Sequence, residues 1–294
     1  MGEAVTASEH RLSRAREIAQ VYTARDDVAA VLVVGSVARG WADPWSDLEL
    51  LVCWTRVPAE LHLEKLANLA GATLGRVFPG EPANDALDEE WQVGELKVDI
   101  LHRSVADIER TIGNVLEGHA TDWGLQAVVA AIWSGIVLHG DAVVEAWRAR
   151  AEYPDGLARA MVETHLTFGP HAWLEMLADR GDMIYLYTLC CEVERRIVGV
   201  LLGLNRTYPP AGDTKWAMQV AGELGIAPPD LRERLLAVFR SEPREGVRGL
   251  TRLIDETIAL AERHMPEVDT GPVRARVAER RPVWGGTGGS ITGG

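Results

Sequence analysis

The residues best suited to chemistry lie in one short stretch, where a single apolar residue separates two acids. Asp47 and Glu49 flank Leu48 at the start of an apolar run that reaches Val52. Because side chains alternate between the two faces of a strand, the spacing predicts that both carboxylates point the same way. Two adjacent carboxylates repel each other and are costly to bury unless a cation lies between them. No His or Cys lies in this cluster, so a hard, oxygen-liganded ion such as Mg²⁺ fits it best.

A small-residue turn precedes the acids. The β-branched run at residues 31–34 ends on Gly35 and Ser36, which predicts a buried strand followed by a turn whose free N–H groups bind phosphate. Gly35 would let the backbone approach phosphate oxygens, and Ser36 can donate its N–H and its hydroxyl. Arg39 either contacts a β- or γ-phosphate or is a solvated residue of the first helical turn. A phosphate-binding turn beside a Mg²⁺ site is the equipment for phosphoryl or nucleotidyl transfer.

Together the two features resemble a known signature. Gly35-Ser36, ten intervening residues and Asp47-apolar-Glu49-apolar are similar to the pattern of the nucleotidyltransferase superfamily related to DNA polymerase beta. The small-molecule branch of that superfamily includes the aminoglycoside and lincosamide nucleotidyltransferases. The resemblance implies ATP as nucleotide donor, two Mg²⁺ ions held by the two acids, and transfer of AMP to a hydroxyl of a small acceptor such as an amino sugar or antibiotic, with release of pyrophosphate.

A third carboxylate completes the site of that family, on a later strand. Asp99, between Val98 and Ile100, has the required place in the chain. By resemblance it is either a metal ligand or the general base that takes the proton from the acceptor hydroxyl. Glu95 is the alternative third acid, although it falls in a predicted turn. The alternative interpretation is that these acids have no catalytic role and are solvated side chains on edge strands.

Few lysines are available to bind the phosphates. The chain has three of them: Lys65, Lys97 and Lys215. Lys215 follows a Pro-rich loop and precedes Trp216, which is similar to the Lys-Trp segment of aminoglycoside-modifying relatives and implies a triphosphate contact. Arg195 and Arg196 either assist in nucleotide binding or pair with Glu192 on the same helix.

Other residue types have weaker claims to the site. Trp41 and Trp45 flank the acidic motif and would stack on a base or line the acceptor pocket. Three later tryptophans are expected in the core: Trp123, Trp133 and Trp173. Three histidines lack metal-ligand spacing and are expected to pack between helices: His139, His165 and His171. Three acids would recognise a cationic acceptor: Asp182, Glu192 and Asp213. Alternatively, Asp182 and Asp213 cap helices and lie on the surface.

Composition limits the class of protein. The formal charge of −13 argues against a nucleic-acid partner, because phosphate backbones are bound by basic patches. Three cysteines, two of them adjacent, provide neither a disulfide framework nor a metal spacing. The first residues are too charged for a signal peptide, and the apolar run at 124–138 is too short to cross a bilayer. We therefore expect a cytoplasmic protein with no membrane partner, a monomer or homodimer.

The elements that must position these residues follow from apolar periodicity. Thr6 and Glu9 form a capping box before a first helix. Strands are predicted at 28–34, 48–54, 90–93 and 96–101, a helix at 58–74, a loop at 78–88, and a further helix from Ser104. Eight more helices are predicted beyond residue 118: 123–136, 142–150, 156–168, 171–178, 183–204, 216–224, 229–239 and 245–263.

This pattern predicts an α/β nucleotidyltransferase domain with a small mixed sheet at residues 1–118. A C-terminal α-helical bundle at 119–266 would close the cleft, and 267–294 would be a flexible Gly/Pro-rich tail. Two alternatives to small-molecule modification remain open. One is regulatory protein nucleotidylation (AMPylation), or a toxin–antitoxin type nucleotidyltransferase, and the other is a degenerate nucleotide-binding module.

Overall fold

The computed structural model describes residues 6–58, 62–80 and 86–280. The chain forms two compact units. Met1–Ala160 and Arg206–Trp216 make up the first, which we call the sheet unit, and Met161–Asn205 and Ala217–Gly294 make up the second, the helical unit. No helix in the described part of the chain is both long and apolar enough to cross a membrane.

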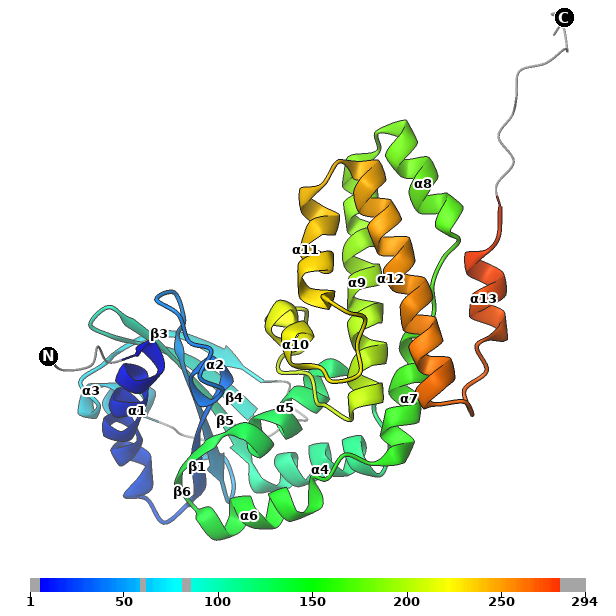
Figure 1. Ribbon diagram of the computed structural model, residues 1–294. Coiled ribbons are helices and arrows are strands. Elements are labelled where there is room, and N and C mark those ends of the chain that lie inside the picture. The colour runs from blue at the N-terminus through cyan, green and yellow to red at the C-terminus, as the bar shows by residue number, and fades with distance from the viewer. Residues whose placement is uncertain (1–5, 59–61, 81–85, 281–294) are drawn as a thin grey trace, which may run out of the picture. The chain divides into compact units, whose positions relative to one another are not determined.

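The sheet unit contains six strands in the order β3–β4–β5–β2–β1–β6 (Figure 1). They are β1 (Val28–Val34), β2 (Leu48–Trp54), β3 (Thr73–Pro79), β4 (Ala86–Val93), β5 (Leu96–Ser104) and β6 (Ile136–His139). Neighbouring strands are antiparallel except β2 and β5, which are parallel. The fold is thus mixed α/β, with the parallel pair at the centre of the sheet.

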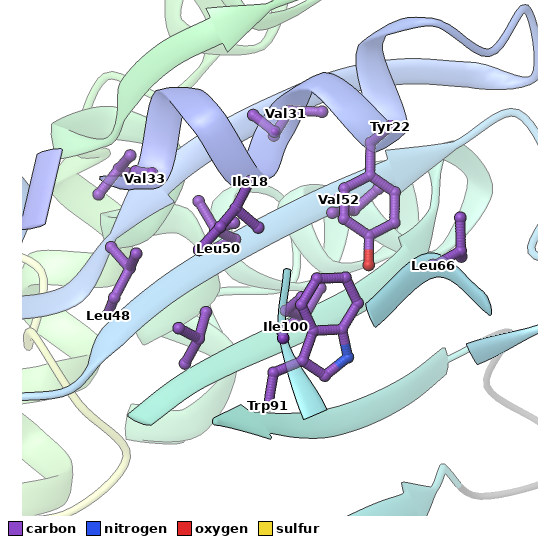
Figure 2. Close-up of a cluster of buried hydrophobic side chains, with 14 of the residues drawn as sticks. Ile18, Tyr22, Val31, Val33, Leu48, Leu50, Val52, Leu66, Trp91 and Ile100 are labelled. Atoms are coloured by element: carbon purple, nitrogen blue, oxygen red, sulfur yellow. The ribbon is translucent and has the colours of Figure 1, made fainter. Parts of the chain in front are cut away.

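One face of the sheet is covered by α1 (Ala7–Thr23) and α3 (Leu63–Leu69). The predicted capping box is present, with the Glu9 N–H donating to the Thr6 hydroxyl and the Thr6 N–H donating to Glu9. Figure 2 shows the apolar side chains of this face, where the ring of Tyr22 stacks on that of Trp91 with centroids 6.0 Å apart. Leu48 and Leu50 belong to this core, so the residues that alternate with them face the other way.

The opposite face of the sheet contacts α4 (Val105–Leu116), α5 (Trp123–Ser134) and α6 (Asp141–Arg150). A one-turn helix, α2 (Gly35–Ala38), follows β1 directly. Glu49 and Asp99 alternate with core residues of the first face, so both belong to this second face.

The helical unit is built from the remaining helices. They are α7 (Asp155–His165, which begins in the sheet unit), α8 (His171–Arg180), α9 (Met183–Asn205), α10 (Ala217–Glu223), α11 (Leu231–Arg240), α12 (Pro243–His264) and α13 (Gly271–Val277). Figure 1 shows α8, α9, α11 and α12 side by side, and α12 contacts the other three. The eight helices predicted after residue 118 coincide with α5 to α12 within three residues at each end.

Three segments differ from the sequence-based expectation. Residues 73–79 form strand β3 where the end of a helix and the start of a loop were expected. This strand lies at the sheet edge with mostly exposed side chains, and its pairing with β4 shifts register between Leu74 and Val77, so it has no apolar alternation to detect. The predicted helix at 58–74 is reduced to α3, and the predicted loop at 78–88 is partly strand; residues 59–61 and 81–85 lie outside the described part.

Strand β6 was also missed, because four half-buried residues between two helices give no periodicity of their own. It pairs with β1, so the sheet unit continues well past the expected boundary at residue 118. The tail expected from residue 267 contains α13, in which Val273 and Val277 are buried. The tail prediction is therefore wrong for 267–280, and residues 281–294 lie outside the described part.

Candidate active site

The predicted acids meet on the second face of the sheet. Glu49 on β2 is in register with Asp99 on β5, and Asp99 is in register with Glu90 on β4. Side chains directly across a ladder share a face and lie close together, so three carboxylates form a row over three strands. Asp47 precedes β2 by one residue, and its charge raises the pKa of Asp99. We call these four residues the acid row.

The carboxylates of the acid row affect one another's pKa. Burial raises the pKa of Glu49, the charges of Asp47 and Asp99 raise it further, and the charge of Lys215 opposes them. The pKa of Asp99 is also raised, chiefly by burial; Lys97 lowers it and Asp47 raises it. The row therefore favours the binding of additional positive charge.

A cation that the sequence did not assign to the site lies within the row. The Lys97 Nζ is 2.8 Å from Asp99 Oδ1, 3.3 Å from Glu90 Oε1 and 3.7 Å from Asp47 Oδ2. Burial acts to lower the pKa of Lys97, but its hydrogen bonds and charge interactions with Asp99 and Glu90 outweigh this, and the pKa is raised. Arg76 neutralises the outer end of the row, with its Nε 3.1 Å from Glu90 Oε2.

The Gly35–Ser36 turn lies against Glu49 of the acid row. Gly35 is left-handed (φ +66°), and a Cβ there would lie 1.6 Å from Glu49 Oε2. The N–H of Ser36 donates to the Glu49 carboxylate. The alignment of Val34 with Glu49 across β1 and β2 brings the turn to this place. A residue with a side chain at position 35 would force the Glu49 carboxylate to move.

Arg39 lies at a cavity of about 360 Å³ within the sheet unit. Its guanidinium is 5.2 Å from the ring centroid of Trp41. The ring centroids of Trp41 and Trp216 are 5.9 Å apart. The other lining residues are Ala130, Trp133, Ser134, Ala151, Glu152, Tyr153, Arg206, Thr207 and Tyr208. The cavity therefore combines two arginines with three aromatic side chains, next to the turn that precedes the acids.

Lys215 belongs to the sheet unit rather than to the helical unit. Residues 206–216 fold with the sheet unit, although they lie between two helices of the helical unit in the sequence. The charge of Lys215 lowers the pKa of Glu49. The Lys215 N–H donates to the Asp213 carboxylate at 2.8 Å, so Asp213 shapes this loop.

For the other candidates the structure gives different surroundings. Arg196 belongs to the helical unit, where it donates to the carbonyl oxygen of Thr167 at 2.6 Å. Glu95 is exposed in the turn between β4 and β5, so Asp99 rather than Glu95 is the third acid of the cluster. His165 packs against Gly199, and burial, with the charges of neighbouring arginines, lowers its pKa to about 4.

The tryptophans divide differently from the prediction. Trp123 is buried, as expected. Trp133 and Trp173 are 52% and 38% exposed, so their assignment to the core is wrong. Trp133 lines the cavity, and Trp173 packs edge-on against Tyr185. Trp45 is 94% exposed in the loop before β2.

The acid row offers a donor set that suits a hard cation. Asp47, Glu49 and Asp99 present only carboxylate oxygens, the ligands that Mg²⁺ prefers. A cation would relieve the repulsion that contributes to the raised pKa of Glu49. In the described part of the chain, no three His, Cys, Asp or Glu side chains are arranged to hold a metal ion as they stand. Two of the three predicted ligands instead contact Lys97.

Comparison with known proteins adds three findings. A family model described as "Domain of unknown function (DUF4037)" matches residues 125–217. The crystal structure of a nucleotidyltransferase-like protein from Exiguobacterium sibiricum 255-15 is similar over 87% of this chain and 80% of that chain, with 14% sequence identity and a TM-score of 0.36. No curated protein matches. The matched segment contains Lys215 but none of the acid row, so the assignment of function rests on the geometry of the sheet unit.

Proposed function

We propose that this chain is a Mg²⁺-dependent nucleotidyltransferase that moves AMP from ATP to a hydroxyl of a small molecule, such as an amino sugar or antibiotic, and releases pyrophosphate. The observation that carries the proposal is the approach of Asp47, Glu49 and Asp99 to one another beside a glycine-serine turn. Three partly buried acids side by side repel one another, and this favours a role in binding positive charge.

Each part of this cluster has a task in the reaction. The N–H groups of the turn and the charges of Lys215 and Arg39 would bind the triphosphate. Mg²⁺, when bound by Asp47 and Glu49, would neutralise the phosphates and lower the pKa of the attacking hydroxyl. Ser36 would exchange its bond to Glu49 for one to a phosphate oxygen.

Asp99 is suited to receive the proton of the acceptor. Its pKa is raised by burial, which makes the carboxylate a better base than an exposed aspartate. As the acceptor oxygen forms its bond to the α-phosphorus, the bond from that phosphorus to the bridging oxygen of pyrophosphate breaks. The proton of the hydroxyl passes to Asp99, and pyrophosphate leaves with the electron pair.

Two other functions use the same cluster. The acceptor would be a protein in an AMPylating or toxin–antitoxin enzyme, and a binding module would hold ATP without transfer. Neither needs a different arrangement of the acids, so the acceptor decides among the three.

The deciding experiment measures pyrophosphate release and acceptor mass. The full chain is incubated with ATP, Mg²⁺ and a panel of aminoglycosides, lincosamides and simple amino sugars, and each acceptor is analysed for the mass of one added AMP. Asp47→Asn should abolish the release, while Glu95→Gln should retain it, since Glu95 is exposed in a turn. AMP found on protein instead would favour the second function. ATP binding without release from any acceptor, or release that survives Asp47→Asn, would contradict the proposal.

A further inference from the structure

The acid row already contains one cation, the ammonium group of Lys97. Lys97 and Asp99 are two positions apart on β5 and therefore share a face. The ammonium donates to Asp99 Oδ2 at 2.9 Å and lies 2.8 Å from Asp99 Oδ1. The ammonium is therefore close to both carboxylate oxygens of Asp99, although it hydrogen-bonds only to Oδ2.

This contact limits where a divalent ion can bind. Mg²⁺ binds carboxylate oxygens at about 2.1 Å. An ion at that distance from either oxygen of Asp99 would lie close to the Lys97 ammonium and be repelled by it. A metal ion on Asp99 would require the lysine to leave, and the departing lysine would also abandon Glu90, 3.3 Å away.

The other end of the row is not restricted in this way. Asp47 Oδ2 is 3.7 Å from the Lys97 Nζ, a longer contact that leaves the carboxylate with acceptor capacity. Glu49 is instead influenced by Lys215 and bonded by Ser36. Asp47 and Glu49 are therefore the pair from which a divalent ion can be held beside the phosphate-binding turn.

We propose that Lys97 takes the place of the second metal ion, so that the site holds a single Mg²⁺ on Asp47 and Glu49 while Asp99 stays bonded to the lysine. This inference rests on the proposed function. It departs from the two-ion site that the sequence resemblance implies, and it assigns Asp99 the role of base rather than metal ligand. Lys97 is then a positioning residue, which orients Asp99 and neutralises the row.

Metal stoichiometry tests the inference without an activity measurement. Mn²⁺ is titrated into the full chain with a nonhydrolysable ATP analogue, and bound ion is counted by electron paramagnetic resonance against the analogue alone. The wild type should bind one Mn²⁺ per chain. Lys97→Met should bind two, because Asp99 becomes free to ligate, whereas Lys97→Arg keeps the positive charge and should bind one. Lys65→Met removes an exposed lysine on α3 and is the matched control, also expected at one.

Two ions on the wild type, or one ion on a folded Lys97→Met, would overturn the inference. Circular dichroism confirms folding, and Lys97→Gln provides a second neutral variant if the methionine variant does not fold. The two proposals fail in different ways. Two ions on the wild type leave nucleotidyl transfer standing, while a chain that binds neither Mn²⁺ nor the analogue loses both.

Discussion

Replacing Gly35 by alanine tests the contact between the turn and the acid row. Gly35 has φ +66°, and the added Cβ would lie 1.6 Å from Glu49 Oε2 and 2.6 Å from Glu49 Cδ. Glu49 must therefore move, and the Ser36 N–H loses its carboxylate partner. Gly71 is the matched control, since it has φ +69° and no heavy atom within 4 Å of an added Cβ.

The two effects can be separated in magnitude. A left-handed alanine costs roughly 1–2 kcal/mol, and this part is common to Gly35→Ala and Gly71→Ala. The lost hydrogen bond to a charged acceptor adds about 1.5–3 kcal/mol at Gly35 alone. We therefore expect Gly35→Ala to lower the free energy of unfolding by about 2.5–5 kcal/mol, against about 1–2 kcal/mol for Gly71→Ala.

Urea unfolding followed by circular dichroism measures both variants, and pyrophosphate release measures their activity. Gly35→Ala should also lose the release, while Gly71→Ala should retain it. In a Glu49→Ala background, Gly35→Ala should cost no more than Gly71→Ala, because the clashing carboxylate is gone. Equal destabilisation by the two glycine variants in the wild-type background, or an active Gly35→Ala, would refute the placement of Glu49 against the turn.

Three further outcomes follow from buried groups. Burial raises the pKa of Glu49 above its ordinary value of 4.5, so the folded chain binds this proton more tightly than the unfolded chain does, and the free energy of unfolding should fall as pH rises above that value. Glu49→Gln should flatten this part of the pH profile measured by urea unfolding, and an unchanged profile would contradict the shift. Burial raises the pKa of Glu194 to about 7, so Glu194→Gln should stabilise the chain at pH 8 by on the order of 3 kcal/mol and by less at pH 5. Glu192→Gln, on the exposed face of the same helix, should show no such gain, and a gain for Glu194→Gln that does not depend on pH would contradict the raised pKa. Tyr22→Phe removes a buried hydrogen bond of 3.2 Å to Glu89 and should lower the free energy of unfolding by about 1.5–3 kcal/mol, and an unaltered urea midpoint would show that this bond contributes nothing.

The loop at 206–216 belongs to the sheet unit, although helices of the helical unit flank it in the sequence. It carries Lys215, whose charge acts on Glu49, and Arg206, which lines the cavity next to Arg39. Both residues fold with the sheet unit. The sheet unit therefore contains the acids, the turn, Arg39 and Lys215, whereas Arg195 and Arg196 belong to the helical unit.

The sequence by itself determined the local parts of this protein. Alternation placed the side chain of Glu49 opposite to those of Leu48 and Leu50, and the apolar runs located β1 and β2. The Gly35–Ser36 turn and its approach to the acids were also predicted, because the turn and the second strand are only a short loop apart. Helical periodicity located α5 to α12, since a helix buries a regular stripe of its own sequence.

Only the tertiary structure decided what meets across the sheet. The register of β5 with β2 and β4 placed Asp99 between Glu49 and Glu90, and it brought Lys97 into the same row. Strand pairing is a contact between distant segments, and no local period specifies its partner or register. The edge strands β3 and β6 escaped prediction for the related reason that they are short or mostly exposed. The sequence therefore named Asp47, Glu49 and Asp99 as candidates, whereas long-range strand pairing brought Lys97 and Glu90 beside them.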